Sequence, residues 1–354
     1  MTKAKPNALR RDTNWRADVL PVARAIVESY NTGVTLRQLF YRLVSLPLDH
    51  PARLPNQDSY YARLAARTAG WRRDGYFPDL VDPRREILGG GGFTSPQEYL
   101  RFQLSSNYYR RNHSEGQPYQ IWLGVEKAGL VNQLSSWFRD LGLRIIALGG
   151  QCSQPYVDEI TRAVRRDGRP ALLWYAGDHD PTGWSILQSF VDRCGYRCWS
   201  NPELPEWNQR QHRPKMRRYI SRPILDRDGY DTGRIKYDVP NFNRYRKFRV
   251  ALTPEQCDRD HPFALVRNSA KEKDINLPNL LANFADTLTD DEFSDGLGVQ
   301  VEVDALDPND LRDLFTRAIE QHWDGSAWEA SKAQEREDIA ELDRIIDGLG
   351  LDRD

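Results

Sequence analysis

Three short apolar runs that alternate with helical patterns constrain the fold of this chain more than any other feature. The runs are IWLGVE (121–126), RIIALGG (144–150) and ALLWYAGD (171–178), and each is followed by apolar residues at helical spacing. Because parallel strands need a crossover connection, which is usually a helix, this alternation predicts a parallel sheet. The sequence therefore predicts an α/β core that begins near residue 119 and extends to about residue 200.

Acidic residues follow two of these runs at the points where the strands should end. Glu126 closes the first run, and Asp178 and Asp180 follow the third. The carboxyl ends of parallel strands meet at one edge of an open sheet, where functional residues gather. Carboxylate oxygens suit Mg²⁺, and Mn²⁺ is a further candidate. We therefore expect Glu126, Asp178 and Asp180 to bind such an ion; the alternative is an ordinary surface turn, where a lone Asp-x-Asp pair is common.

The N-terminal segment has three helical patterns separated by short breaks. Apolar residues recur at helical spacing over 14–31, and Thr35 and Gln38 are placed for a capping box at the start of a second helix. A third helical pattern covers 59–75. This arrangement is typical of a helix-turn-helix or winged-helix module, and a plain helical bundle is the alternative.

Basic and acidic residues are unevenly distributed, although the formal net charge is only −1. Basic residues outnumber acidic ones over 1–118 and 208–250, whereas acidic residues dominate from 286 onward. Two basic segments can face a polyanion while an acidic segment points elsewhere. Near residue 245, Tyr245 and Phe248 alternate with arginines, which is typical of phosphate contacts combined with stacking on bases. A solvated basic face is the alternative.

The cysteines and the lack of long apolar runs bear on the compartment. The four cysteines form no paired Cys-x-x-Cys motif, which favours reduced thiols over a zinc site or a disulfide. No apolar run approaches the roughly 18 residues that span a bilayer, and the basic start of the chain leads into no apolar segment of the kind found in signal peptides. We therefore expect a cytoplasmic protein without a membrane partner, associated with the nucleoid if it is prokaryotic.

The order of these motifs resembles a known family of nucleic-acid enzymes. A strand ending in Glu126, a second strand followed by glycines, and a third strand leading into DHDPTG (178–183) resemble a Toprim domain, the Rossmann-like domain of topoisomerases, bacterial primases and several nucleases. The Pro-x-Gly after the acidic pair and Lys127 after Glu126 are most similar to the A subunit of topoisomerase VI and its meiotic double-strand-break relatives, a type IIB topoisomerase family. RVALTPEQ and VEVDALDP resemble the compact, stand-alone Mini-A relatives, which suggest mobile elements or phage.

The family also has an N-terminal winged helix with a nucleophilic tyrosine, and TLRQLFY (35–41) resembles that motif. Thr35, Arg37, Phe40 and Tyr41 occupy the matching positions, and Phe40 stands where the family commonly has a first tyrosine, so Tyr41 is the hydroxyl candidate. Arg37 and Tyr41 are four residues apart and share one helix face. A guanidinium there favours the phenolate and can grip a phosphate. Packing of Tyr41 in a helical core is the alternative.

The resemblance implies DNA cleavage by Mg²⁺-dependent transesterification. Tyr41 would form a covalent 5′-phosphotyrosyl intermediate, with the metal at the three acidic residues and with Glu126 moving a proton to or from the leaving 3′ oxygen. It also implies double-stranded DNA as substrate and a homodimer in which the tyrosine of one protomer serves the metal site of the other. Strand passage would need a separate ATPase B-type subunit, because this sequence has no GxxxxGK motif. The residues expected to contact DNA are Arg37, Arg42, Arg84, Arg85, Lys127, Arg217 and Arg218.

This interpretation divides the chain into four parts and adds further elements. Strands are expected at 246–253 and 299–306, and acidic amphipathic helices at about 308–323 and 327–347. The four parts are a winged-helix domain with the Gly89–Gly92 linker (1–92), a connecting helix (93–118), a Toprim domain with a basic insertion at about 205–250 (119–305), and acidic C-terminal helices (306–354).

Two other functions are consistent with the same residues. A hydrolytic Toprim nuclease would use the same metal site with water in place of Tyr41. A DNA-binding protein with a vestigial site would keep the basic segments and cleave nothing. Primase activity is a weaker alternative, because no zinc-ribbon cysteines accompany the acidic residues.

Overall fold

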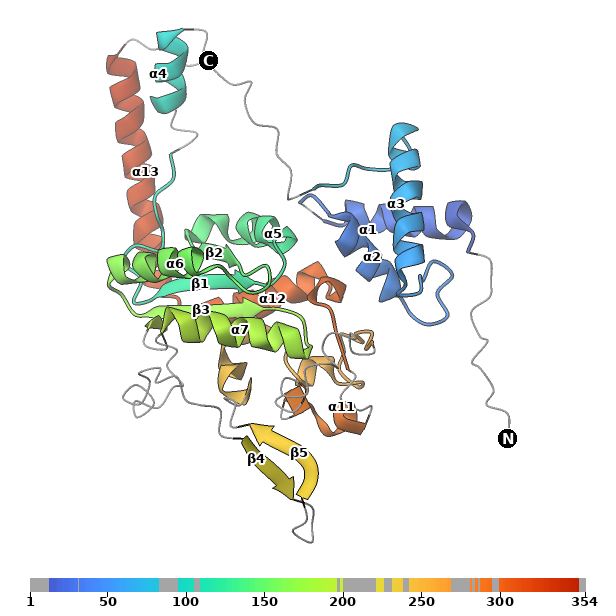
Figure 1. Cartoon of the computed structure of the whole chain (residues 1–354). Helices are drawn as coiled ribbons and strands as arrows, with labels where there is room; N and C mark the ends of the chain where they lie inside the picture. Colours follow the sequence, from blue (N-terminus) through green and yellow to red (C-terminus); the bar gives the residue numbers. More distant parts are fainter. Residues whose placement is uncertain are drawn as a thin grey trace, which may run out of the picture.

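The computed structural model describes most of the chain between residues 13 and 349, and within that part the fold is mixed α/β (Figure 1). No helix among the described residues has both the length and the apolar character needed to cross a membrane. The described residues are 13–30, 32–82, 95–104, 109–195, 198–199, 221–225, 231–237, 242–268, 281, 284–285, 287–294 and 299–349.

Four strands of the described chain form an all-parallel sheet in the order β2-β1-β3-β6. β1 (Gln120–Val125) and β3 (Ala171–Ala176) are central, whereas β2 (Arg144–Ala147) and β6 (Arg249–Ala251) are at the edges. Every residue of β1 and β3 is buried, as expected of parallel strands that are covered on both faces. The parallel sheet predicted from the three apolar runs is confirmed.

Helices cover both faces of the sheet and enclose two hydrophobic cores (Figure 1). One face packs against α5 (Gly129–Phe138) and α12 (Pro308–Glu320). The other face packs against α6 (Gln154–Asp167) and α7 (Pro181–Cys194). Because successive strand residues point to opposite faces, each central strand contributes side chains to both cores.

The N-terminal module has a core of its own, built from helices. A π-helical turn (Trp15–Val19) leads into α1 (Leu20–Glu28), and α2 (Leu36–Val44) and α3 (Asp58–Arg73) follow. Residues from all of these elements pack together around a buried cluster that includes Leu39. The three predicted N-terminal helices are therefore present.

The predicted capping box starts α2, but the wing of a winged helix is not shown. The hydroxyl of Thr35 accepts a hydrogen bond from the backbone N–H of Gln38, and the Gln38 side chain accepts one from the N–H of Thr35. The capping box is therefore confirmed. The described part of residues 13–82 contains no strand, so the winged-helix assignment still rests on the sequence.

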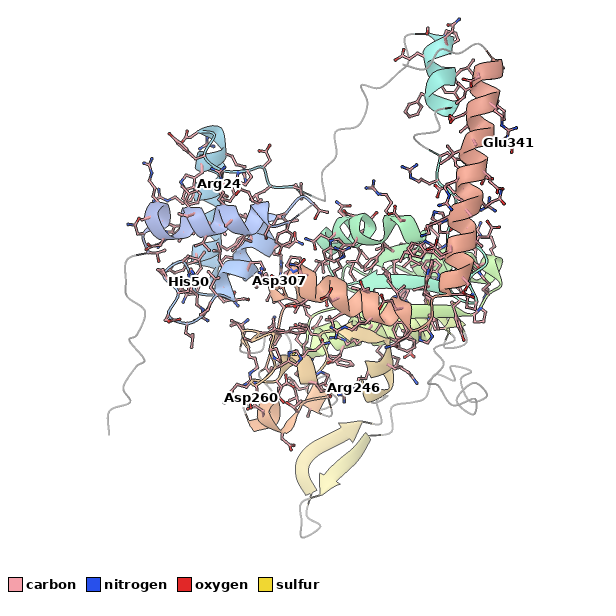
Figure 2. All side chains as sticks on the ribbon, turned by 180° about the vertical axis from the view of Figure 1, so that it is seen from behind. Arg24, His50, Arg246, Asp260, Asp307 and Glu341 are labelled. Carbon is pink, nitrogen blue, oxygen red and sulfur yellow. The ribbon has the colours of Figure 1, made fainter. Side chains whose placement is uncertain are left out.

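Helix α2 joins the N-terminal module to the sheet domain (Figure 2). Nη2 of Arg42 lies 2.7 Å from Oδ2 of Asp307, which is labelled at the junction in Figure 2. A Cβ placed on Gly129 at the start of α5 would lie 3.3 Å from Cγ2 of Thr35, so this contact is close. Helix α2 also packs against the 3₁₀ turn η6 (Val303–Ala305). The helix that carries Tyr41 thus lies against the sheet domain of its own chain.

The C-terminal helix α13 (Gly325–Gly348) extends away from the sheet, with α4 (Pro96–Leu104) beside its far end (Figure 1). The segment before β1 runs along α13. Tyr109 donates from its hydroxyl to Asp338 at 2.7 Å, and Arg111 binds the same carboxylate at 2.7 Å. The two predicted C-terminal helices are confirmed by α12 and α13.

The described part of the basic insertion contains the hairpin β4 (Ser221–Leu225) and β5 (Asp231–Tyr237) and the 3₁₀ helix η4 (Phe242–Phe248). Tyr245 and Phe248 are buried in the core that includes α7. The Tyr245 hydroxyl donates to Asp192 at 2.7 Å. The prediction that these two aromatic residues stack on bases is wrong, because their rings are enclosed by the protein itself.

The segment 299–306 does not form the predicted strand. Gln300 and Val301 make only isolated bridges, and the chain then turns at η6. The N–H of Val303 donates to Oδ1 of Asp178 at 2.9 Å instead of to a neighbouring strand. A side-chain acceptor therefore ends the extended conformation and brings this segment to the carboxyl edge of the sheet.

Candidate active site at the carboxyl edge of the sheet

The site begins where the two central strands end. Val125 of β1 pairs with Ala176 of β3, so Glu126 and Asp178 leave the sheet next to each other. The N–H of Asp178 donates to Oε2 of Glu126 at 2.9 Å. Since β2 lies on one side of β1 and β3 on the other, this is the switch point at which open α/β sheets bind their ligands. The structure brings Glu126 and Asp178 together there.

Asp180 has a structural role that the sequence interpretation did not include. It is the N-cap of α7, and its Oδ1 accepts a hydrogen bond from the N–H of Gly183 at 2.6 Å. Pro181 occupies the first turn, where its missing N–H has no cost. The N-terminal end of α7, which favours negative charge, therefore begins within the acidic motif. Metal binding by Asp180 stays a prediction.

Two further carboxylates join the cluster from the segment 299–306. Glu302 is 2% exposed and Asp304 is 5% exposed. Oδ1 of Asp304 is buried and has no hydrogen-bond partner among the described residues. The sequence interpretation missed both residues, although their Glu-x-Asp spacing within an apolar run resembles the Asp-x-Asp signal after the third strand. That spacing was interpreted only as part of a strand.

Lys127 lies among these carboxylates. Its Nζ is 2.5 Å from Oδ2 of Asp178, 2.9 Å from Oε2 of Glu302 and 4.0 Å from Oε1 of Glu126. The Lys127 side chain is 18% exposed. An ammonium group therefore balances part of the negative charge of the cluster, whereas the sequence interpretation placed Lys127 at the DNA.

Tyr41 reaches the edge of this cluster through Arg37. Nη2 of Arg37 lies 3.4 Å from the Tyr41 hydroxyl and 3.6 Å from Oε2 of Glu302. The guanidinium also lies over the Tyr41 ring, with 5.4 Å between Cζ and the ring centroid. The Arg37 side chain is 52% exposed, whereas Glu302 is 2% exposed. The predicted pairing of Arg37 with Tyr41 is observed, and it places the pair beside an acidic residue of the same chain.

Burial determines the protonation of the cluster. It raises the pKa of Asp178 well above its usual range, with the charge of Glu126 adding to the shift and Lys127 opposing it. Burial also raises the pKa of Asp304 to about 6. Burial by itself would lower the pKa of Lys127, but Asp178 and Glu302 outweigh it and hold that pKa above its usual range. The lysine is therefore charged, whereas Asp178 and Asp304 resist ionisation.

Arg249 holds the backbone of the acidic loop in place. Its guanidinium is buried and donates to the carbonyl oxygens of Gly177 (3.1 Å), Leu252 (2.7 Å) and Asp178 (2.8 Å). Its Cζ also lies 4.2 Å from the ring centroid of Trp184 in α7. Because hydrogen bonds from a charged donor are stronger than neutral ones, these contacts fix the direction in which the loop leaves β3.

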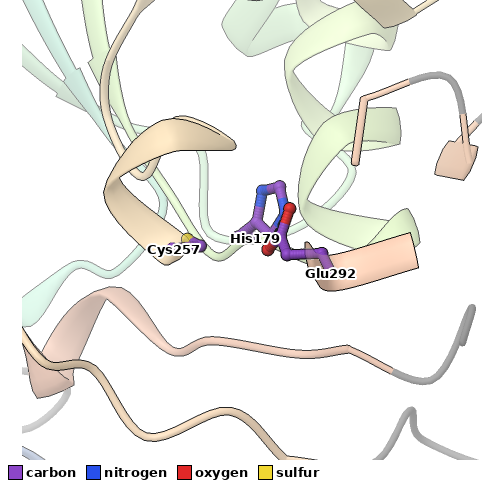
Figure 3. A group of neighbouring side chains, drawn as sticks. All are labelled: His179, Cys257 and Glu292. Carbon is purple, nitrogen blue, oxygen red and sulfur yellow. Dashed lines mark ion pairs between the residues drawn. The ribbon is translucent and has the colours of Figure 1, made fainter. Parts of the chain in front are cut away.

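A second group of side chains could hold a metal ion, whose identity the structure does not define. It consists of His179, Cys257 and Glu292 (Figure 3). All three are buried, and their ligand atoms lie within 4.8 Å of one another. Nε2 of His179 is 3.1 Å from Oε1 of Glu292. Cys257 ends the short helix η5 (Glu255–Cys257), and Glu292 belongs to α11 (Asp290–Ser294).

One contact of the imidazole ring argues against a metal in this second group, although Nε2 of His179 and Oε1 of Glu292 are buried and make no hydrogen bond with the described residues. The indole N–H of Trp184 can only donate, and it lies 3.3 Å from Nδ1 of His179. Nδ1 is therefore the acceptor, and the neutral ring carries its proton on Nε2, toward Glu292, where a metal would need a lone pair. Burial lowers the pKa of His179 against the opposing effect of Glu292, which keeps the ring neutral.

The remaining residues predicted at the DNA divide into two sets. Arg37 and Arg42 lie on α2 and pair with acidic residues of the sheet domain. The other predicted contacts, Arg84, Arg85, Arg217 and Arg218, lie outside the described residues. Comparison of the chain with protein-family models, with curated proteins and with solved structures gave no match.

Replacing Gly183 by Ala should distort the acidic loop. A Cβ at Gly183 would overlap the carbonyl oxygen of Asp178, and backbone atoms cannot move aside as a flexible side chain can. We expect a loss of about 1–3 kcal/mol in the free energy of unfolding, measured by chemical denaturation. Gly70→Ala in α3 is the matched control, because a Cβ there meets nothing within 4 Å; it should stabilise the helix by about 0.5–1 kcal/mol. Equal effects of the two substitutions would contradict the close contact.

Asp304 should make the metal-free protein less stable as the pH rises. Its pKa is about 6 in the folded protein against an ordinary value of 3.8. Between these values the folded protein keeps a proton that the unfolded chain has released, so the free energy of unfolding falls with increasing pH. The stabilisation is fully present below pH 3.8 and lost above about pH 6.

Chemical denaturation in EDTA, for wild type and Asp304→Asn, measures this effect. Between about pH 4 and about pH 7, wild type should lose up to about 3 kcal/mol relative to the variant, whose amide does not titrate. Asp313→Asn on the exposed face of α12 is the control and should keep the wild-type pH dependence. Parallel curves for wild type and Asp304→Asn would contradict the buried carboxyl group.

Proposed function

We propose that this chain is a topoisomerase-VI-A-like protein that cleaves double-stranded DNA by transesterification, with Tyr41 as the nucleophile. The observation that carries the proposal is the position of Arg37, which is 3.4 Å from the Tyr41 hydroxyl and 3.6 Å from Glu302. Glu302 in turn shares Lys127 with Asp178. The N-terminal tyrosine and the carboxylates at the sheet edge, which were inferred from separate motifs, therefore meet at one place.

The donor set fits a divalent cation such as Mg²⁺, with Mn²⁺ as an alternative. Glu126, Asp178 and Asp180 would hold it, and Glu302 adds a carboxylate beside them. Two observations support the fit: an ammonium group already stands among the carboxylates, and the buried Oδ1 of Asp304 has no partner among the described residues. When bound, the ion would stabilise negative charge on the oxygens of the reacting phosphate.

The residues of the chain supply the remaining parts of the reaction. The Tyr41 oxygen attacks the phosphorus, a phosphotyrosyl bond forms at the 5′ phosphate, and the bond to the 3′ oxygen breaks. Arg37 favours the phenolate form of Tyr41 and can bind a phosphate oxygen with the same guanidinium. The phenol proton of Tyr41 passes to solvent, the leaving 3′ oxygen gains a proton, and Glu126 moves a proton to or from that oxygen. In this proposal the N-terminal module is a winged helix and the sheet domain is a Toprim domain.

The contacts of α2 also bear on the proposed oligomer. In the related family the tyrosine of one protomer serves the metal site of the other, which implies a homodimer. Here Arg37 and Arg42 link the tyrosine helix to acidic residues of the same chain. These contacts support a site assembled within one chain, so that a homodimer would contain two complete sites. A separate ATPase B-type subunit belongs to the proposal only if the protein passes one duplex through another.

Tyr41→Phe distinguishes transesterification from hydrolysis. Supercoiled plasmid is incubated with Mg²⁺ or Mn²⁺, and the products are run on denaturing gels with and without protease. Wild type should give protein-linked 5′ ends, and the variant should lose both the covalent adduct and cleavage by at least about 100-fold, because no other group replaces the phenol oxygen. Tyr61→Phe, on the same module, is the control.

Continued cutting by Tyr41→Phe, with free ends, would favour the hydrolytic nuclease. A wild type that binds DNA without cutting it, and an Asp178→Asn variant that binds equally well, would favour the vestigial site.

Mixing two inactive variants tests assembly within one chain. Tyr41→Phe lacks the nucleophile and Asp178→Asn lacks a carboxylate, so each chain of a mixed dimer would carry one defect. If each site uses residues of one chain, the mixture should stay as inactive as the separate variants in the plasmid assay. If the tyrosine instead works with the partner's carboxylates, as in the related family, each mixed dimer has one intact site. The mixture should then nick one strand of the plasmid, which neither variant does alone.

A further inference from the structure

We propose that Lys127 is an internal counter-cation that occupies the metal position and must move out when the divalent ion binds. This inference rests on the metal site of the proposed function and concerns how that site is kept intact before the ion arrives. It assigns Lys127 a role different from a simple DNA contact. The site would bind a divalent cation, and this cation would replace the ammonium group of Lys127.

One oxygen of each of two carboxylates is already held by the backbone. Oδ1 of Asp178 accepts the N–H of Val303, and Oε2 of Glu126 accepts the N–H of Asp178, both at 2.9 Å. The other oxygen of each residue faces Lys127: Oδ2 of Asp178 is 2.5 Å from Nζ and Oε1 of Glu126 is 4.0 Å from it. The oxygens that a metal would need are therefore those around the ammonium group.

The buried carboxylates also need a positive charge beside them. The side chains of Asp178 and Glu302 are each 2% exposed, and both contact the same ammonium group. Two negative charges around one buried group repel each other strongly, because the medium has a low dielectric constant. The other nearby cations are placed differently: Arg249 donates to backbone carbonyls, and Arg37 is 3.6 Å from Glu302. Lys127 is in direct contact with both Asp178 and Glu302. Without it, the carboxylates would have to take up protons or separate.

A lysine side chain is suited to such an exchange. An ammonium group has three donors on a flexible four-carbon chain, so it can exchange one set of acceptors for another when a second cation takes its place. The Lys127 side chain is 18% exposed and so has a route toward solvent. When the ion takes the carboxylate oxygens, Nζ can turn outward to a phosphate oxygen of the substrate. The exchange would couple metal binding to a positive charge at the phosphate.

Divalent-cation binding by the full-length protein without DNA tests the exchange. Mn²⁺ affinity is measured by electron paramagnetic resonance at constant pH for wild type, Lys127→Met and Lys127→Arg. Lys127→Met removes the competing charge and should bind Mn²⁺ about tenfold more tightly or better, whereas Lys127→Arg keeps the charge and should stay near wild type. Unchanged or weaker binding by Lys127→Met would overturn the proposal.

An Asp178→Asn variant separates failure of this inference from failure of the metal site. If Asp178→Asn abolishes binding and Lys127→Met does not strengthen it, the exchange is wrong and the metal site stands. If wild type binds no Mn²⁺, or Asp178→Asn binds as well as wild type, the metal site itself is wrong and the exchange falls with it. Tighter binding by Lys127→Met together with loss in Asp178→Asn supports both.

A measurement on the wild-type protein keeps the test open if Lys127→Met does not fold. In protein with ¹⁵N-labelled lysine, the ammonium resonance of Lys127 is identified by its absence from Lys127→Arg. Saturating Mg²⁺ should shift or remove this resonance, because the ammonium group loses its carboxylate partners. The resonance of Lys332, which binds Glu329 and lies over Trp328, should not change. A Lys127 resonance that stays in place at saturating Mg²⁺ would overturn the exchange.

Discussion

Asp178 connects several parts of the candidate site. Its N–H binds Glu126 beyond β1, its Oδ1 accepts the N–H of Val303, its Oδ2 faces Lys127, and its carbonyl oxygen accepts from Arg249. These four contacts join the ends of both central strands, the edge strand β6 and the segment before α12. Glu126, Lys127, Val303 and Arg249 are therefore held in place through contacts with one buried residue.

The cost of such a cluster explains its neighbours. Burying several carboxylates is unfavourable unless charges are paired and hydrogen bonds are satisfied. The chain responds with the ammonium group of Lys127 and the capping bonds at the start of α7. Asp304 remains with one buried oxygen that has no partner among the described residues. Proteins tend to retain incompletely satisfied polar groups at functional sites, which is consistent with a site built to receive a cation.

Much of the fold could be predicted because its signals are local. Unbroken apolar runs predict β1 and β3, whose buried positions follow from a sheet covered on both faces. The capping box at Thr35 depends on two residues three positions apart. Glu126 and Asp178 could be placed together because parallel strands end at one edge. Tyr245 and Phe248 were misjudged, because a local pattern of aromatic and basic residues does not reveal which side chains the core encloses.

The sequence by itself determined the order of strands and helices, the start of α2 and the acidic residues that follow the strands. Periodicity and capping act over a few residues, so they can be read along the chain. Only the tertiary structure decided that Glu302 and Asp304 join those acids, that Lys127 lies among them and that Arg37 links Tyr41 to Glu302. The contact of Lys127 with Glu302 joins residues 175 positions apart in the chain. Such contacts arise from packing of α2 and η6 on the sheet edge, for which no short motif carries the information.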